Sequence, residues 1–253
     1  MQSHHFYKVA ILFVIILICL NCESQRVVQI FLIGDSTMAD KPIEGNPERG
    51  WGQLLPEFFH SSVKINNHAV NGRSTKSFID EGRWDVVLDS LKPGDYVMIQ
   101  FGHNDQKDYD STRYAAPYGA YQSNLIRFVN ESKAKKSNPI LITPVMRRRF
   151  DENGQFYDTH GDYPDVVREL AESLQIPLID LHQSSKQFIE QLGEENSKKI
   201  FLWVKPGEYP RFPEGKEDNT HFSEYGARQI AQLVVKEILK TDLNLKNYLN
   251  ALQ

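Results

Sequence analysis

Cysteine is scarce in this chain of 253 residues. The only two cysteines, Cys19 and Cys22, lie at the end of an apolar run close to the start of the sequence. We therefore expect no disulfide in the rest of the chain, although this scarcity does not exclude an oxidising compartment.

The apolar run itself is too short to span a membrane. Val9–Leu20 holds 12 residues without a charge, whereas a spanning helix needs roughly 20. Lys8 precedes the run and polar residues follow it, a pattern that is typical of a secretory signal peptide at residues 1–22. A buried N-terminal helix is the alternative interpretation.

A lipid attached to Cys22 would hold the protein on a membrane surface without a spanning helix. Asn21, however, is not the small residue that usually precedes such a cysteine, so lipidation and free secretion both stay open. The N-terminal sequence thus predicts a protein that is secreted, periplasmic or held at the cell surface as a lipoprotein.

Basic residues are not in excess either. The formal net charge is −4 and the isoelectric point is about 6.1. Two small basic clusters, one at Lys133, Lys135 and Lys136 and one at Arg147–Arg149, are interpreted as solvated helix ends or loops, so a nucleic-acid partner is not expected. Since repeats, low-complexity tracts and flexible linkers are also lacking, residues 23–253 are expected to form one domain, with a monomer as the default.

Strands and helices are predicted to alternate along this domain. Short apolar runs predict buried strands at Val27–Ile33, Val63–Val70, Tyr96–Phe101, Ile140–Thr143 and Ile176–Leu181. Apolar residues at helical spacing predict helices at Trp51–Phe59, Trp84–Leu91, Tyr118–Lys133, Asp165–Leu174 and Glu224–Leu239. Because the strands are continuous apolar runs, they indicate an α/β fold in which helices cover both faces of a parallel sheet.

Three polar motifs follow directly after predicted strands, where such sheets bind their ligands. They are Gly34–Thr37, Asn71–Ser74 and Gly102–Asp105. Taken singly, each is explained by local structure. Ser36 could cap a helix that begins there, and the other two motifs are rich in turn residues.

A fourth motif, Asp218–His221, precedes the last predicted helix. A carboxylate three residues before a histidine can meet it within one loop and fix its tautomer, while the other ring nitrogen takes a proton. The alternative is a helix cap beside a surface histidine. Together the four motifs supply a nucleophile, a base, a carboxylate and oxyanion donors, which are the components of an acyl-transfer site.

The order of these blocks resembles the SGNH (or GDSL) hydrolase superfamily over nearly the whole of residues 27–239. Gly34–Ser36 resembles its nucleophile block, Gly72 its glycine block, Gly102–Asp105 its asparagine block and Asp218–His221 its Asp-x-x-His block. Thr37 stands where the motif that names the family has leucine. The resemblance implies a flavodoxin-like three-layer α/β/α sandwich.

The sequence that flanks these blocks resembles that of rhamnogalacturonan acetylesterases, above all in Ile33–Asp40, Gly50–Gly52 and Asn71–Phe78. This resemblance implies that Ser36, Asp218 and His221 form a catalytic triad. It also implies that Ser36, Gly72 and Asn104 hold the oxyanion and that acetyl groups leave an acetylated polysaccharide through an acyl-enzyme. No metal or organic cofactor is expected.

Other functions stay open at this point: a lipase, thioesterase or phospholipase of the same superfamily, an acetyl xylan esterase, or a binding protein that kept the fold. Aromatic residues on loops would suit sugar faces or could pack in the core: Trp84, Tyr109, Tyr114, Tyr118, Trp203, Tyr209 and Phe212. The proline-rich segment Phe201–Gly215 either shapes a substrate cleft or is a plain connection.

Overall fold

Five parallel strands form the central sheet of the computed structural model, which describes residues 27–251. In spatial order they are β3 (Val63–Asn67), β1 (Val28–Gly34), β4 (Tyr96–Gln100), β5 (Asn138–Ile142) and β6 (Leu178–Ile179). Each of the five apolar runs forms a strand, as predicted. The last strand is shorter than predicted because Leu181 begins a helix instead.

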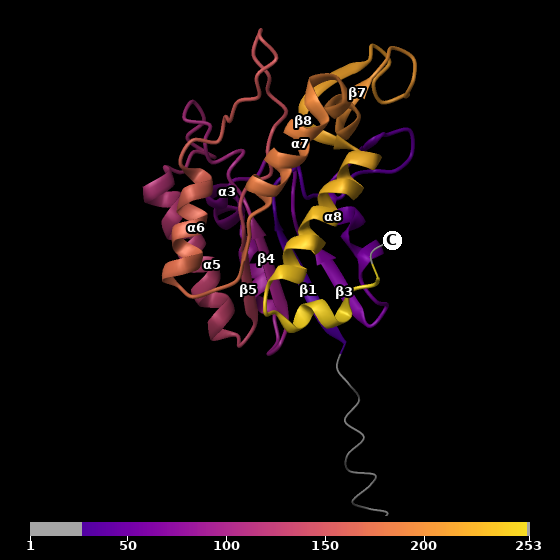
Figure 1. Cartoon of the computed structure of the whole chain (residues 1–253). Helices are drawn as coiled ribbons and strands as arrows, with labels where there is room; N and C mark the ends of the chain where they lie inside the picture. Colours follow the sequence, from indigo (N-terminus) through magenta and orange to yellow (C-terminus); the bar gives the residue numbers. More distant parts are fainter. Residues whose placement is uncertain (1–26, 252–253) are drawn as a thin grey trace, which may run out of the picture.

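Helices cover both faces of this sheet, and the predicted three-layer α/β/α sandwich is confirmed (Figure 1). One layer holds α3 (Thr75–Asp80), α4 (Arg83–Ser90), α5 (Gln122–Ala134) and α6 (Tyr163–Ser173). The other holds α2 (Trp51–Leu54), α7 (Leu181–Ser197) and α8 (Glu224–Lys240). Short 3-10 or π turns add Leu55–Phe58, Pro117–Tyr121, Lys198–Ile200 and Asn244–Tyr248.

Alternate residues of each strand face opposite layers, as the pleat of a strand requires. Ile30 and Leu32 of β1 pack with α8, whereas Phe31 and Ile33 pack with α4 and α5. The sequence therefore reads as continuous apolar runs because both faces of the sheet are buried. Trp84 belongs to this core: it is fully buried and packs edge-on against Phe128, so it is not a loop aromatic for sugar binding.

A second, antiparallel sheet lies over the carboxyl end of the central sheet (Figure 1). It consists of β2 (Glu48–Arg49), β8 (Lys216–Ser223) and β7 (Phe201–Val204). The strand pattern of the sequence did not predict it, and α3 and α7 were also not predicted. α7 is mostly polar and is interrupted at Gly193, where φ is +71°.

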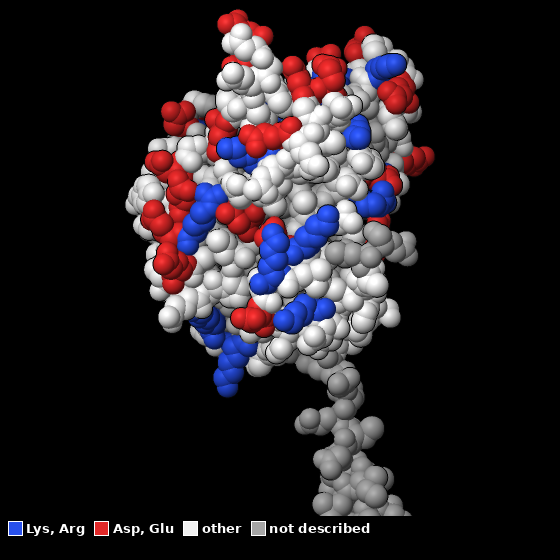
Figure 2. All heavy atoms as spheres, viewed as in Figure 1, with Lys and Arg blue, Asp and Glu red and all other residues white. Residues whose placement is uncertain are grey.

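The predicted signal segment 1–22 and the lipid-attachment candidate Cys22 lie outside the described residues. Within residues 27–251, no helix is both long and apolar enough to cross a membrane. On the face drawn in Figure 2, lysines and arginines are interspersed with acidic residues over the helices and loops. The basic cluster at Lys133–Lys136 lies at the end of α5, as predicted, but the solvated interpretation of Arg147–Arg149 is wrong for Arg148, which is buried.

Candidate active site

Ser36 lies on a tight turn immediately after β1. The backbone N–H groups of Met38 and Ala39 both donate to the carbonyl of Asp35, at 3.2 and 3.0 Å. This turn does not continue into a helix, because the next described helix begins only at Trp51. The alternative interpretation, in which Ser36 caps a helix, is therefore wrong.

The side chain of Asp35 holds this turn through buried hydrogen bonds. Its carboxylate is fully buried and accepts hydrogen bonds from the backbone and hydroxyl of Thr37, at 2.9 and 2.8 Å, and contacts His103 Nδ1 at 2.9 Å. Burial alone would raise the pKa of Asp35, but His103 and Thr37 outweigh it and lower that pKa to about 2. The ionised carboxylate thus fixes the turn that presents Ser36, a role that sequence reasoning missed.

Thr37, which stands at the leucine position of the motif that the sequence resembles, makes polar contacts with its hydroxyl and its carbonyl. Its hydroxyl donates to Asp35 and accepts from Gln100 at 3.3 Å, while its carbonyl accepts from the backbone of Trp51 at 2.9 Å. The glycines around Trp51 permit this approach, since a Cβ on Gly50 would lie 2.2 Å from the Ala39 carbonyl oxygen.

Gly72 reaches the same edge of the sheet from β3. Two hydrogen bonds extend the β1–β3 pairing beyond the regular strand: His68 N–H donates to Leu32 at 2.9 Å and Val70 N–H donates to Gly34 at 3.1 Å. The chain then turns at Gly72, where φ is +76°, a conformation that favours glycine. The glycine block therefore lies beside the serine block.

Asn104 follows β4 and is nearly fully buried. Its side-chain nitrogen donates to the carbonyl of Arg73 at 3.1 Å, and its oxygen accepts from Lys107 Nζ at 2.8 Å. Because Lys107 holds the oxygen end, the nitrogen end faces the Gly72–Arg73 segment. An amide nitrogen carries two hydrogens, so one remains for a further acceptor.

Asp105 ties this loop to the helix that follows the glycine block. Its buried carboxyl accepts from the backbone and hydroxyl of Thr75, at 2.9 and 2.5 Å, and from the backbone of Gly102 at 3.1 Å. Burial outweighs these hydrogen bonds and raises the pKa of Asp105 to about 7. Asp105 thereby holds the glycine and asparagine blocks together, and the contact of His103 with Asp35 joins the asparagine block to the serine block.

Asp218 and His221 do not lie in a loop, as predicted, but within strand β8. Phe222 pairs with Phe201 and Asp218 pairs with the next residue of β7, Leu202, so the residues between Asp218 and Phe222 bulge out of the ladder. The bulge brings the two side chains together: His221 Nδ1 lies 2.9 Å from Asp218 Oδ2.

The other nitrogen of His221, Nε2, lies 2.8 Å from Ser36 Oγ, although the two residues are 185 positions apart. Asp218 also accepts from the backbone of Thr220 at 2.7 Å and of His221 at 3.0 Å. Partial burial opposes ionisation, but the contacts with His221 and Thr220 outweigh it and hold the pKa of Asp218 well below its usual range. Asp218 is therefore a carboxylate that accepts from His221, as a base-orienting group requires.

Arg148, a buried residue, holds the bulge through its hydrogen bonds to Asn219. Its Nη1 donates to the side-chain oxygen of Asn219 at 3.0 Å, and its backbone N–H donates to the Asn219 carbonyl at 2.9 Å. Trp203 donates to the same Asn219 oxygen at 2.9 Å, and the guanidinium of Arg148 lies 5.2 Å from the Trp203 ring centroid. Asn219 stands between Asp218 and His221, so these contacts position the bulge that carries the histidine.

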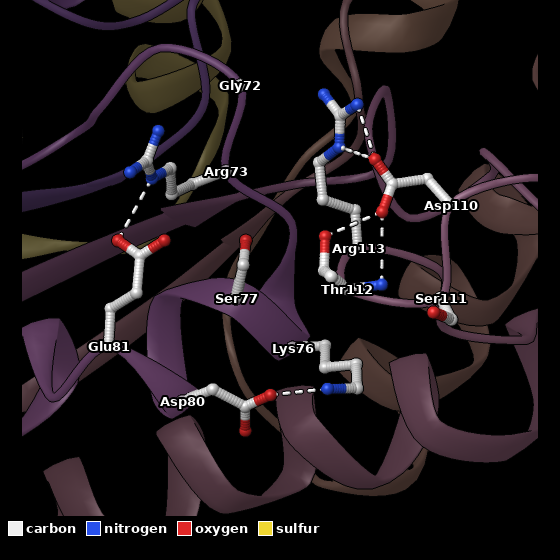
Figure 3. A pocket seen from close by; sticks show the side chains of 10 residues that line it. All are labelled: Gly72, Arg73, Lys76, Ser77, Asp80, Glu81, Asp110, Ser111, Thr112 and Arg113. Carbon is white, nitrogen blue, oxygen red and sulfur yellow. Dashed lines mark hydrogen bonds and ion pairs between the residues drawn. The ribbon is translucent and has the colours of Figure 1, made fainter.

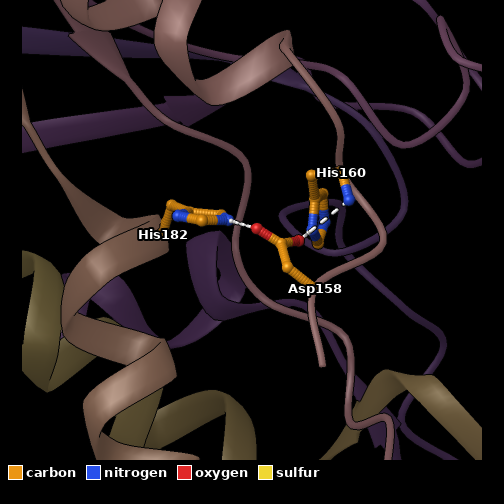
Figure 4. A group of neighbouring side chains, drawn as sticks. All are labelled: Asp158, His160 and His182. Atoms are coloured by element: carbon orange, nitrogen blue, oxygen red, sulfur yellow. Dashed lines mark hydrogen bonds and ion pairs between the residues drawn. The ribbon is translucent and has the colours of Figure 1, made fainter. Parts of the chain in front are cut away.

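One group in the described part of the chain has residues suited to a metal ion: Asp158, His160 and His182 (Figure 4). The carboxylate of Asp158 contacts His160 Nδ1 and His182 Nε2, each at 2.8 Å. Arg168 donates to the other ring nitrogen of His182 at 3.2 Å. These hydrogen bonds join the segment before α6 to the start of α7, but they leave the buried Nε2 of His160 without a hydrogen-bond partner among the described residues.

The chain matches a known protein family and two similar proteins over most of its length. The sequence model described as the GDSL-like lipase/acylhydrolase family matches residues 32–229. Rhamnogalacturonan acetylesterase RhgT of Bacillus subtilis (strain 168) is 44% identical over 225 residues, which cover 89% of this chain and 95% of RhgT. Probable rhamnogalacturonan acetylesterase YesY of the same organism is 36% identical over 216 residues, which cover 85% of this chain and 94% of YesY.

A solved structure also matches. The crystal structure of protein YxiM from Bacillus subtilis superimposes with a TM-score of 0.74 at 25% identity. The match covers 86% of this chain but only 57% of the YxiM chain.

Proposed function

The chain belongs to the GDSL-like lipase/acylhydrolase family, and from that premise we propose that it is a serine esterase that removes O-acetyl groups from rhamnogalacturonan. The observation that carries the proposal is the hydrogen-bonded series Ser36–His221–Asp218, with contacts of 2.8 and 2.9 Å at the carboxyl end of the central sheet. The similarity to RhgT supports the substrate.

In the proposed mechanism, Ser36 Oγ attacks the carbonyl carbon of the acetyl ester while His221 Nε2 takes its proton. Asp218 accepts from His221 Nδ1 and stabilises the imidazolium that forms. The intermediate collapses when His221 gives the proton to the sugar oxygen, so that the bond between the acetyl carbon and this oxygen breaks and the acetyl group remains on Ser36. His221 then takes a proton from water, which attacks the acetyl carbon, and returns that proton to Ser36 Oγ as acetate leaves.

The negative charge on the intermediate needs donors that are already in place. We assign this role to the backbone N–H groups of Ser36 and Gly72 and to the side-chain amide of Asn104. The buried Asn104 supports the assignment, because Lys107 turns its nitrogen end toward the Gly72–Arg73 segment. These groups are protein donors, so the mechanism uses no cofactor.

We propose further that residues 1–22 are a signal peptide and residues 23–253 the catalytic domain. The enzyme would act as a monomer outside the cytoplasm, either free or anchored by a lipid on Cys22. Intact-mass analysis of the protein recovered from its native membrane and medium fractions tests this. A chain that begins at Cys22 with an added lipid mass supports anchoring, with cleavage just before Cys22. A chain that begins at Glu23 supports free secretion, and a full-length chain with Met1 refutes both forms of export.

The function is tested by acetate release from acetylated rhamnogalacturonan, homogalacturonan and xylan under the same conditions. We expect the highest kcat/KM on rhamnogalacturonan. A higher value on xylan would instead identify an acetyl xylan esterase, and a preference for nitrophenyl esters of eight or more carbons would identify a lipase. Absence of acetate release from all three polymers would refute the proposal.

Covalent capture tests the nucleophile separately. Treatment with an organophosphorus ester should add one adduct, on Ser36, and Ser36→Ala should lose both labelling and turnover. A folded protein that keeps Ser36 unlabelled while it still hydrolyses nitrophenyl acetate would rule out the acyl-enzyme mechanism.

A further inference from the structure

An open pocket of about 560 Å³ adjoins Gly72 (Figure 3). The turn at Gly72–Arg73 forms one wall, helix α3 forms the floor, and the segment Asp110–Arg113 forms the opposite wall. The pocket shares Arg73 with the active site, since the carbonyl of Arg73 accepts the hydrogen bond from Asn104. A ligand in this pocket would therefore lie next to the proposed oxyanion donors.

The acidic side chains of the pocket already have partners. Asp110 accepts from the backbone and hydroxyl of Thr112, at 3.0 and 2.6 Å, and from two nitrogens of Arg113, at 2.6 and 2.5 Å. Glu81 accepts from Arg73 at 3.0 Å. Asp80 forms an ion pair with Lys76. These carboxylates are thus poor sites for ligand hydroxyls, and the spare hydrogen-bonding capacity lies with the cations.

The guanidinium of Arg113 has one nitrogen that does not face Asp110 and can donate hydrogen bonds to a ligand. Its Nε and Nη2 face Asp110, and Figure 3 shows the third nitrogen, Nη1, pointing away from that carboxylate. A Cβ placed on Gly72 would lie 3.8 Å from this Nη1. The free end of the guanidinium therefore faces the glycine that is proposed to bind the oxyanion.

Lys107 adds a second cation on the other side of Asn104. Among the described residues its ammonium donates to the Asn104 amide oxygen at 2.8 Å and forms no ion pair. Burial lowers the pKa of Lys107, and the charges of Arg113 and Arg147 lower it further, whereas Asp35 and Asp110 act in the opposite direction. Lys107 and Arg113 are thus close enough for their charges to interact.

Both cations belong to one rigid loop. The ends of the loop are joined where the Ala115 N–H donates to the Asp105 carbonyl at 3.0 Å. The hydroxyl of Tyr163 also donates to the carbonyls of Asp105 and Ala115, at 3.1 and 2.9 Å. A loop that is fixed at its base can hold Lys107 and Arg113 in place before a ligand arrives.

We propose that Arg113 Nη1 forms a carboxylate subsite in this pocket, which binds a uronate carboxylate of the polysaccharide next to the acetylated sugar. The inference rests on the proposed function, because it assumes a polymer that carries both acetyl esters and uronic acids. The planar guanidinium suits a carboxylate, and the charge of Lys107, on the same loop, adds to the positive potential near the subsite. The subsite would select acidic polymers over neutral ones.

The subsite is tested with acetylated oligogalacturonides whose carboxylates are either free or methyl-esterified. The measured quantity is the ratio of kcat/KM for the free acid to that for the methyl ester, from acetate release. We expect a ratio well above one for the wild type, a roughly ten-fold lower ratio for Arg113→Met, and a smaller loss for Arg113→Lys, which keeps the charge. Ten-fold corresponds to about 1.4 kcal/mol.

Lys76→Met is the matched control, because it removes one positive charge from the same pocket but from a lysine already paired with Asp80. The ratio should stay at its wild-type value in this variant. An equal fall of the ratio in Lys76→Met and Arg113→Met would mean that only the net charge of the pocket matters, and a wild-type ratio near one would overturn the subsite.

A binding experiment separates this inference from the proposed function. Unacetylated trigalacturonate should inhibit the hydrolysis of 4-nitrophenyl acetate by the wild type, whereas xylotriose should not, and Arg113→Met should weaken the inhibition about ten-fold. If trigalacturonate inhibits but acetylated rhamnogalacturonan is not deacetylated, the subsite stands and the proposed function fails. If neither sugar inhibits, or both inhibit equally, the subsite is refuted whatever the polymer assay shows.

Discussion

Replacing Arg148 by lysine should reduce turnover although Arg148 is not one of the proposed reacting residues. The arginine is only 4% exposed and donates to two other segments, α7 and β8. Its guanidinium donates to the carbonyl of Glu194 at 2.7 Å, to the hydroxyl of Ser197 at 3.0 Å and to the side chain of Asn219 at 3.0 Å. A lysine keeps the charge, but its single nitrogen cannot reach all three acceptors.

The cost follows from the acceptors that lose their donor. A hydrogen bond to a charged group contributes about 1.5–3 kcal/mol, and these energies do not add fully. We therefore expect Arg148→Lys to lower the free energy of unfolding by about 3 kcal/mol. For a domain of this size that corresponds to a fall in Tm of roughly 6–12 °C.

Turnover should fall for a different reason. Asn219 would lose the arginine that holds the bulge between Asp218 and His221, and a shift of about 1 Å in a reacting group can cost on the order of 100-fold in rate. We expect kcat on 4-nitrophenyl acetate at 25 °C, far below the Tm, to fall roughly 10- to 100-fold, with little change in KM.

The exposed neighbour Arg149 provides the control, and Arg149→Lys should retain the wild-type Tm and kcat. If Arg148→Lys lowered the Tm but kept the full kcat, Arg148 would be a stabilising residue that does not position His221. If it changed neither quantity, the energies assigned to its buried contacts would be wrong.

Three further predictions concern the site and its surroundings. Asn104→Ala should lower kcat on 4-nitrophenyl acetate about 100- to 1000-fold in a protein that stays folded at the assay temperature, because it removes one oxyanion donor. Asp218→Asn should lower kcat by on the order of 10⁴, because an amide cannot accept from His221 and from two backbone N–H groups with the same geometry. His160→Gln should flatten the pH dependence of stability between pH 6.5 and 3, measured by urea unfolding.

The sign of the His160 effect follows from linkage. Burial, together with the charges of His103 and Arg147, lowers the pKa of His160 from 6.5 to about 3, so the unfolded chain binds the additional proton first. The contribution of His160 is therefore complete above pH 6.5 and is lost as the pH falls toward 3, by at most about 5 kcal/mol. Glutamine does not titrate, so identical pH slopes in the wild type and the variant would show that His160 is not held neutral.

Controls for the two active-site variants are equally direct. Full esterase activity in Asn104→Ala would remove Asn104 from the oxyanion site. For Asp218→Asn, a loss smaller than ten-fold would show that another group orients His221, since the described carboxylate in contact with its Nδ1 is that of Asp218.

Much of the fold follows from local sequence patterns. The continuous apolar runs such as Val27–Ile33 require cover on both faces, and the structure buries Ile30 and Phe31 in opposite layers. The glycines and polar residues that end these runs determined which side chains meet at the carboxyl edge of the sheet, because parallel strands all end there. Ser36, Gly72 and Asn104 could be selected from the sequence for that reason.

The tertiary structure alone decided how those residues are held. No local pattern distinguishes a serine that caps a helix from a serine on an isolated turn. Contacts with distant residues hold the turn of Ser36, among them that of His103, 68 positions away, with the Asp35 carboxylate. Likewise, Arg148 looks like a solvated residue in the sequence, and it is buried because its acceptors come from α7 and β8. Such long-range contacts also form the bulge in β8 that brings His221 to Ser36, so the sequence determined the composition of the site and the packing of distant segments determined its geometry.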